Sequence, residues 1–293
     1  MQGRVLLHEV HGRAAEARTL VYDGDCPICL GIVGGLVRAR LLPAERAVPY
    51  QELEGEEAER LWEAGIRNEI AALERPGGGV RTGIGALLWI LRDSWLGPLA
   101  RLVDRRPLRR GLELAYRTIA YNRRILAPAR PTQGPSCECD PDFHAGYRAV
   151  GIALSAGFAF AAALLFGAVA RRTSPLGVAL PLTAAWFAAA GLGLFLVRGG
   201  REGRERAWTF AGHVAVVAAI SALPLVAASC IVPALDVPRA ERWLLAAAFI
   251  ASGAISAVLI PHRTLAQRLG RPHAFGWFVA VMLGMATVAL LAS

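Results

Sequence analysis

The sequence contains no lysine, so arginine carries all of the fixed positive side-chain charge of a chain with formal net charge +9. The arginines are not interleaved with aromatic residues in the manner of nucleic-acid-binding surfaces, and we expect no nucleic-acid partner. Cysteine is scarce as well. Five cysteines in 293 residues are too few and too scattered for the disulfide framework of a small secreted protein. The cysteines are therefore expected to serve catalysis or metal binding.

The N-terminal segment also lacks a feature, namely the apolar core of a secretory signal. Residues 1–17 mix Arg, Glu and His around one short apolar run, Val5-Leu6-Leu7. Without such a core the segment does not direct export. We expect the N-terminal domain to stay in the cytoplasm.

Apolar residues, by contrast, are abundant, and they gather in the second half of the chain. Hydrophobic residues make up 55% of the sequence, and the mean hydropathy of +0.41 is too high for a purely soluble protein. Five runs are long enough to span a bilayer: 149–170, 176–197, 207–235, 243–260 and 274–292. The sequence therefore predicts two domains, a thiol domain over 1–147 and an all-α transmembrane domain of five helices over 148–293.

The arginines between these runs predict their direction. The loops over 198–206 and 261–273 are rich in arginine, whereas the other loops carry few. The positive-inside rule then places the N-terminal domain in the cytoplasm and Ser293 outside, in a multi-pass protein of the inner or plasma membrane. Within the runs, His213 is expected to be a hydrogen-bonded residue near the cytoplasmic side, and Cys230 a packing residue.

The candidate reactive residues, two cysteines and two aspartates, lie in one short segment: Tyr22-Asp23-Gly24-Asp25-Cys26-Pro27-Ile28-Cys29. A buried strand over 18–22 precedes it, and an amphipathic helix with Leu30, Val33, Val37 and Leu41 on its apolar stripe follows it. Cys26 is thus expected at a helix N-terminus, where free N–H groups and the helix dipole stabilise a thiolate. Cys29 lies one turn further along and can resolve a mixed disulfide formed at Cys26.

The two acids of this segment have two interpretations. A carboxylate next to Cys26 opposes its thiolate, but Asp23 could accept the proton of a buried Cys29 as a general base. Both acids can also be turn residues, or Asp25 a helix N-cap. We take Asp23 as a candidate catalytic residue together with Cys26 and Cys29.

The same Cys-x-x-Cys spacing also serves as half of a zinc site. A linker rich in Pro, Gly and acids, 128–142, carries Cys137 and Cys139. This pair can exchange disulfides with Cys26 and Cys29, complete a Zn²⁺ or Cu⁺ site with them, or have no role. No other cofactor is expected.

The sequence predicts that the first domain is an α/β unit built around the dithiol. Strands are expected over 46–51 and 69–74, and a helix over 54–64 is expected to end at Gly65. A turn at 76–79 leads into 80–82 as a hairpin, and a core helix follows over 85–91. This order suits a thioredoxin-like sheet with the dithiol at the carboxyl end of a strand. Between Arg101 and Arg130 the predicted helices are strongly basic, as a solvated face or as a contact with anionic lipid headgroups.

The dithiol segment resembles the signature of the DCC family of predicted thiol-disulfide oxidoreductases, named for Asp-x-x-Cys-x-x-Cys. The stretch 81–87 is similar to that family's helix start, the stretch 116–123 to its Tyr-x-x-Ile-Ala-x-Asn-Arg ending, and Cys137 to a later family cysteine. The resemblance covers about residues 18–142. It implies a thioredoxin-like fold with Asp23, Cys26 and Cys29 as functional residues.

These observations predict a membrane-anchored thiol-disulfide oxidoreductase that reduces a protein disulfide or a small oxidised thiol at the cytoplasmic face. Two alternatives remain. In one, the four thiols at positions 26, 29, 137 and 139 handle a metal. In the other, the thiol domain regulates a transporter or a quinone-linked membrane protein.

Overall fold

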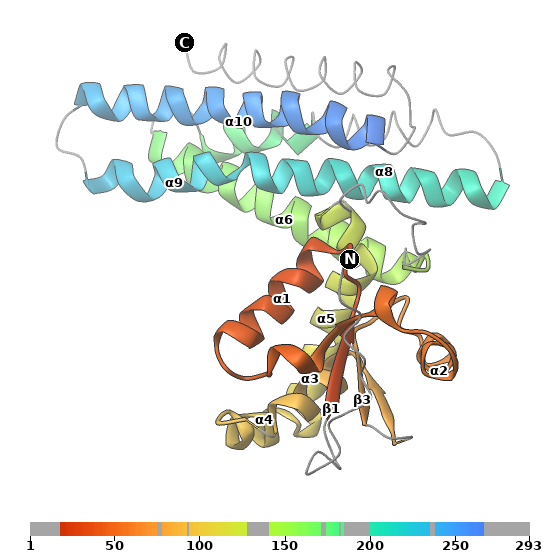
Figure 1. Cartoon of the computed structure of the whole chain (residues 1–293). Coiled ribbons are helices and arrows are strands. Elements are labelled where there is room, and N and C mark those ends of the chain that lie inside the picture. Colours follow the sequence, from red (N-terminus) through yellow and green to blue (C-terminus); the bar gives the residue numbers. More distant parts are fainter. Residues whose placement is uncertain are drawn as a thin grey trace, which may run out of the picture. The chain divides into compact units, whose positions relative to one another are not determined.

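The computed structural model describes residues 18–74, 78–92, 94–127, 141–170, 174–181, 183–184, 200–234 and 238–266. The chain divides into two compact units, Met1–Asp142 and Phe143–Ser293. The first unit holds a small mixed sheet among helices, and the described part of the second is helical (Figure 1).

The sheet of the first unit has four strands in the order β2-β1-β3-β4. Their bounds are β1 Arg18–Tyr22, β2 Ala47–Pro49, β3 Ala71–Glu74 and β4 Val80–Thr82. β1 is parallel to β2 and antiparallel to β3, and β3 and β4 form an antiparallel pair. Leu20 in the centre of β1 is opposite Ala47 on one side and Ala72 on the other.

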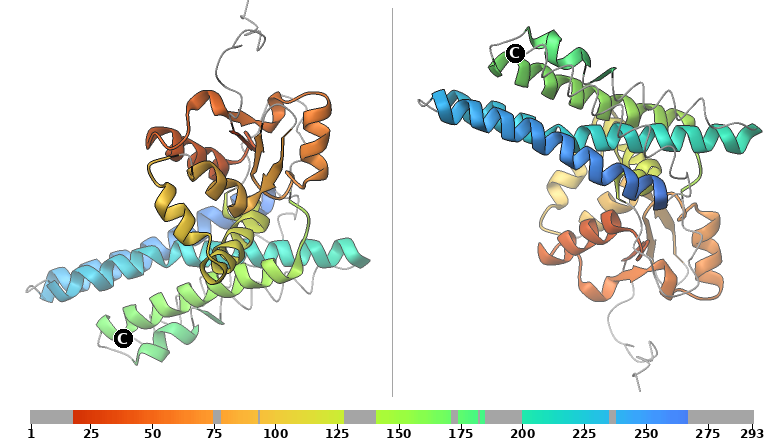
Figure 2. Two further views of the ribbon diagram at one scale, coloured as in Figure 1. Left: turned by 90° about the horizontal axis from the view of Figure 1, so that it is seen from below. Right: turned by 90° about the horizontal axis from the view of Figure 1, so that it is seen from above.

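Helices cover both faces of this sheet, as Figures 1 and 2 show. Successive strand residues point to opposite faces. Leu20 and Ala72 therefore pack against α1 (Pro27–Arg38) and α3 (Gly83–Leu91) on one face. Val21 and Ala71 pack with Leu61 of α2 (Glu56–Glu63) on the other face. The dithiol belongs to the α1–α3 face.

Local structure differs from the sequence predictions at two places. β2 ends at Pro49 and continues as a short 3₁₀ helix, Tyr50–Glu52, where a longer strand was predicted. A second 3₁₀ helix, Ala44–Arg46, precedes it. The predicted stripe of α1 is confirmed in part: Val33 is buried and Val37 packs partly buried against the same cluster, which Cys29 joins, but the helix ends at Arg38, before Leu41. The predicted helix over 54–64 is present as the shorter α2, which ends at Glu63, and the core helix that ends at Leu91 and the β3–β4 pair are confirmed.

Two further helices, α4 (Gly97–Val103) and α5 (Arg106–Leu126), carry the arginine-rich segment. Arg101, Arg105 and Arg110 are exposed, in agreement with a basic solvent-facing surface. For Arg123 and Arg124 at the end of α5 that prediction is wrong, because both side chains turn inward.

The described part of the second unit consists of long apolar helices, which Figures 1 and 2 show side by side. They include α6 (Ala145–Ala170), α8 (Gly200–Ser221), the shorter α9 (Leu223–Ile231) and α10 (Pro238–Ala266), with a 3₁₀ turn at Val232–Ala234. Residues 175–181 and 183–184 are helical as well. Small side chains allow close packing: Ala159 and Ala162 of α6 contact a cluster that includes Phe210 and Val214 of α8. A buried hydrogen bond of 2.7 Å joins Ser256 of α10 to Ser221 of α8.

Three helical segments in the described residues are long and apolar enough to cross a membrane: Ala145–Ala170, Gly203–Ala234 and Ala240–Leu259. They coincide with three of the five predicted runs. Most of the run 176–197 and all of 274–292 lie outside the described residues. The predicted loop over 198–206 is wrong in part, since α8 begins at Gly200. His213 is buried in α8, whereas Cys230 is exposed on α9 and does not pack as predicted.

Candidate functional site

The dithiol lies where β1 turns into α1, as the sequence predicts. β1 ends at Tyr22, and the Cys26 N–H donates to the Asp23 carbonyl at 3.2 Å, which closes the turn. Cys26 is the N-cap of α1, and its Sγ accepts from the Cys29 N–H at 3.4 Å. Pro27 occupies the first turn, where no N–H is needed. Cys26, not Asp25, therefore caps the helix.

Both thiols are free and buried. Cys26 has no exposed surface and Cys29 is 6% exposed. They belong to the apolar cluster that includes Leu20 of β1 and Trp89 of α3. A bulky group can therefore reach Cys26 only if this face opens locally.

The two thiols differ in acidity. A hydrogen bond from the Cys29 thiol lowers the pKa of Cys26 to about 6, with further help from the Cys29 N–H and from the charge of Arg123, while burial opposes the shift. The same thiol–thiol hydrogen bond, together with burial, raises the pKa of Cys29. Asp23 also contributes to the rise at Cys29. The pair therefore has one acidic thiol at the helix start and one that keeps its proton.

Asp23 is buried beside the dithiol, and both of its carboxylate oxygens accept hydrogen bonds from neighbouring groups. Oδ1 accepts from the Asp25 N–H at 3.0 Å and from Gln51 Nε2 at 3.2 Å. Oδ2 accepts from Arg124 at 3.1 Å and lies 3.5 Å from Arg123. Among the described residues it makes no hydrogen bond to either thiol. The structure thus places Asp23 with the cysteines but connects it to arginines, which the sequence did not predict.

Arg123 and Arg124, which contact Asp23, come from a segment far from it in the sequence. They stand in the last turn of α5, about a hundred positions after Asp23 along the chain. Arg123 is 4% exposed and also donates to the carbonyl oxygens of Asn68 at 3.0 Å and Arg67 at 2.6 Å. One guanidinium therefore ties the end of α5 to the loop before β3 and to the turn beside the dithiol.

Two more side chains fix the same region. Gln51 accepts from the Gly24 N–H at 3.0 Å while its amide nitrogen donates to Asp23, so it holds the turn from the β2 side. Tyr116 of α5 accepts the Ile70 N–H at 2.8 Å. Tyr116 and Arg123 belong to the stretch 116–123, so the spacing of seven residues along one helix face was the available signal for them.

Of the four cysteines of the alternative metal site, the described residues include only Cys26 and Cys29. In the described residues no group of three or more His, Cys, Asp and Glu side chains is placed to hold a metal ion. Cys137 and Cys139, which that site would need, lie outside the described residues. A comparison of the chain with protein-family models, curated proteins and solved structures finds no match.

Proposed function

We propose that this protein is a membrane-anchored thiol-disulfide oxidoreductase that uses Cys26 and Cys29. The observation that supports this proposal best is the asymmetry of the two thiols. Hydrogen bonds from the Cys29 thiol and from N–H groups at the start of α1 lower the pKa of Cys26, and the pKa of Cys29 is raised. A thiolate that is populated at neutral pH beside a protonated partner is the starting state for disulfide exchange.

In this reaction the Cys26 thiolate attacks one sulfur of the substrate disulfide, and the other sulfur leaves as a thiolate that takes up a proton. Cys29 then loses its proton and attacks Cys26 Sγ, which releases the second substrate thiol and leaves a Cys26–Cys29 disulfide. Two electrons pass from the dithiol to the substrate. We assign Asp23 to hold the turn with Arg123 and Arg124. Acceptance of the Cys29 proton by Asp23 stays a prediction.

The proposed fold of the first unit is thioredoxin-like, with the DCC-type segment as its active site. Its support is the strand order β2-β1-β3-β4, the parallel β1–β2 pair with α1 between them in the chain, and the antiparallel β3–β4 pair followed by α3. The dithiol follows the carboxyl end of β1, the end at which open α/β sheets place their sites.

The proposed location is the inner or plasma membrane, with five spans, the dithiol in the cytoplasm and Ser293 outside. The three candidate spans and the arginine-rich segments support it. In the cytosol the dithiol acts as a reductant, because that compartment keeps thiols reduced. A reporter that is active only outside the cytoplasm, fused after Ser293, should be active. An inactive fusion would contradict this orientation.

The proposed lipid contact of the first unit uses α4 and the start of α5. Trp95, in the turn just before α4, is 71% exposed, and Leu99 and Leu108 are about half exposed near the exposed Arg101 and Arg105. Apolar side chains flanked by arginines suit the interface of an anionic bilayer. Brominated phosphatidylglycerol in nanodiscs should quench part of the wild-type fluorescence that the Trp95→Phe protein lacks. Equal quenching of both proteins would contradict the contact.

Trapping the reaction intermediate tests the proposed function. In Cys29→Ser the mixed disulfide at Cys26 has no internal exit, so covalent complexes should accumulate on non-reducing gels after acid quenching. Cys26→Ser should form none, and Cys137→Ser and Cys139→Ser serve as controls for the linker thiols. If Cys29→Ser folds but traps nothing, and reduced wild-type protein retains stoichiometric zinc, the metal-handling alternative replaces the redox one.

A further inference from the structure

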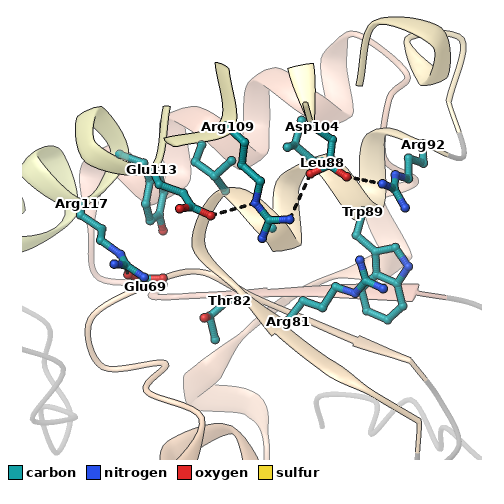
Figure 3. A pocket seen from close by; sticks show the side chains of 13 residues that line it. Glu69, Arg81, Thr82, Leu88, Trp89, Arg92, Asp104, Arg109, Glu113 and Arg117 are labelled. Carbon is teal, nitrogen blue, oxygen red and sulfur yellow. Dashed lines mark hydrogen bonds and ion pairs between the residues drawn. The ribbon is translucent and has the colours of Figure 1, made fainter. Parts of the chain in front are cut away.

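A cavity of about 350 Å³ lies in the first unit between β4, α3 and α5 (Figure 3). This volume falls within the range of small-molecule sites, roughly 300 to 1,000 Å³. One face of α5 forms a wall, since Arg109, Glu113 and Arg117 recur every four residues and all line the cavity. Neither Cys26 nor Cys29 lines it. The cavity is therefore a site distinct from the dithiol.

The charged residues that line the cavity do not balance. The lining contains four arginines and three carboxylates. Each carboxylate forms an ion pair with one or two arginines of the same lining: Asp104 with Arg92 and Arg109, Glu113 with Arg109, and Glu69 with Arg117. The three acids are thus already neutralised, and the cavity keeps one positive charge in excess.

The excess charge belongs to Arg81. Its guanidinium lies 4.6 Å from the centre of the Trp89 ring, and it has no carboxylate partner among the described residues. Arginine stacked on an aromatic ring keeps its N–H edge free for a planar or tetrahedral oxyanion. Arg92 adds a second donor to the lining, because Asp104 engages only its Nη2 and the side chain is 35% exposed.

Both donors lie at the same end of the cavity. Figure 3 shows Arg81 and Arg92 near Trp89, with Glu69 and Arg117 at the opposite end. Leu88 and Ile84 add apolar wall beside the charged groups. A ligand that satisfies this arrangement has an oxyanion group at the Trp89 end and a small organic body in the rest of the volume.

We propose that this cavity binds a small organic anion, a carboxylate or a phosphate ester, through Arg81 and Arg92 beside Trp89. The proposal does not depend on the dithiol reaction, and either can fail without the other. A phosphate ester has two possible sources, a soluble molecule or a phospholipid headgroup, which share the same chemistry.

Binding is measured by calorimetry on the full chain in phosphatidylcholine nanodiscs, with inorganic phosphate, succinate and sn-glycerol 3-phosphate as probes and choline as the cationic control. At least one anion should bind saturably, and choline should not. Arg81→Gln should weaken that binding about tenfold to a hundredfold, the loss expected for one charge-assisted contact. Arg110→Gln, an exposed arginine of α5 outside the cavity, should leave it unchanged.

Repeating the titration in phosphatidylglycerol nanodiscs identifies the source. Weaker binding of glycerol 3-phosphate there means that the lipid headgroup competes for the cavity, and equal binding means a soluble ligand. Circular dichroism of each variant establishes that it is folded, and Arg81→Lys should recover part of the affinity. The proposal is overturned if none of the three anions binds saturably, or if Arg81→Gln and Arg110→Gln reduce binding equally.

Discussion

Replacing Arg123 with glutamine removes the guanidinium that joins the end of α5 to the turn beside the dithiol. The side chain is 4% exposed, so its contacts are not screened by solvent. Glutamine keeps polarity and much of the length but cannot donate to the Asn68 and Arg67 carbonyls and to Asp23 at the same time. The substitution therefore tests one defined set of interactions.

The size of the effect follows from those contacts. A buried acceptor left without its donor costs about 1–3 kcal/mol, and breaking a buried ion pair costs about 3–5 kcal/mol. Asp23 keeps Arg124 at 3.1 Å, closer than the 3.5 Å of Arg123, so its charge is not left alone. We expect Arg123→Gln to lower the free energy of unfolding of the first unit by about 3 kcal/mol, near the lower end of the ion-pair range.

Three matched variants give the expected order of effects. Arg124→Gln loses the contact with Asp23 of a side chain that is 16% exposed and should cost about 1–2 kcal/mol. The exposed Arg110→Gln should stay within about 0.5 kcal/mol of wild type. Arg123→Lys keeps the charge but not the fork of donors, so it should recover only part of the loss.

The assay is alkylation of the buried Cys29 at fixed pH in increasing urea, read by mass spectrometry of its peptide. This measures opening of the first unit without requiring the membrane unit to unfold. Arg123→Gln should shift the transition to lower urea and raise the pKa of Cys26, because Arg123 lowers it in the wild type. Indistinguishable transitions for Arg123→Gln and Arg110→Gln would refute this account of Arg123.

Two further predictions concern pH and Tyr116. The pKa of Cys26 is lowered to about 6, so its thiolate stabilises the reduced fold fully above the unfolded value near 8.5, and this stabilisation is lost as the pH falls toward 6. The raised pKa of Cys29 acts oppositely above about 8.5, so stability by pulse proteolysis should peak near that pH, and a flat profile would contradict the assigned shifts. Tyr116→Phe leaves the Ile70 N–H without its acceptor and should cost about 1–3 kcal/mol in the urea assay; no change would mean that water replaces the hydroxyl.

Local pattern was sufficient to predict much of the first unit. The strand before the dithiol, the start of α1 at Pro27 and the buried α3 depend on neighbouring residues, and the structure has each of them. The failures of local prediction have local causes too. Pro49 ends β2 because it has no N–H to donate to a neighbouring strand, and arginine favours helix strongly enough for α8 to begin at Gly200.

The surroundings of the dithiol were not predictable in this way. The Asp23–Arg124 contact joins residues 101 positions apart, and no periodicity in either segment records it. Cys26 is buried in one cluster with Trp89 and Ile90 of α3, which are distant from it in the sequence. The sequence therefore located the two cysteines and Asp23 but not the groups that set their acidity and access.

The central claim, that Cys26 and Cys29 form a redox-active dithiol, is tested most directly by an equilibrium redox titration of the full chain. The protein is equilibrated in thiol–disulfide buffers of increasing potential and quenched in acid. The mass of the peptide that contains both cysteines is then measured by mass spectrometry. The account predicts one reversible two-electron transition in which this peptide loses two hydrogens, and its absence in both Cys26→Ser and Cys29→Ser. A folded wild-type protein whose Cys26–Cys29 peptide stays reduced at every potential would contradict it.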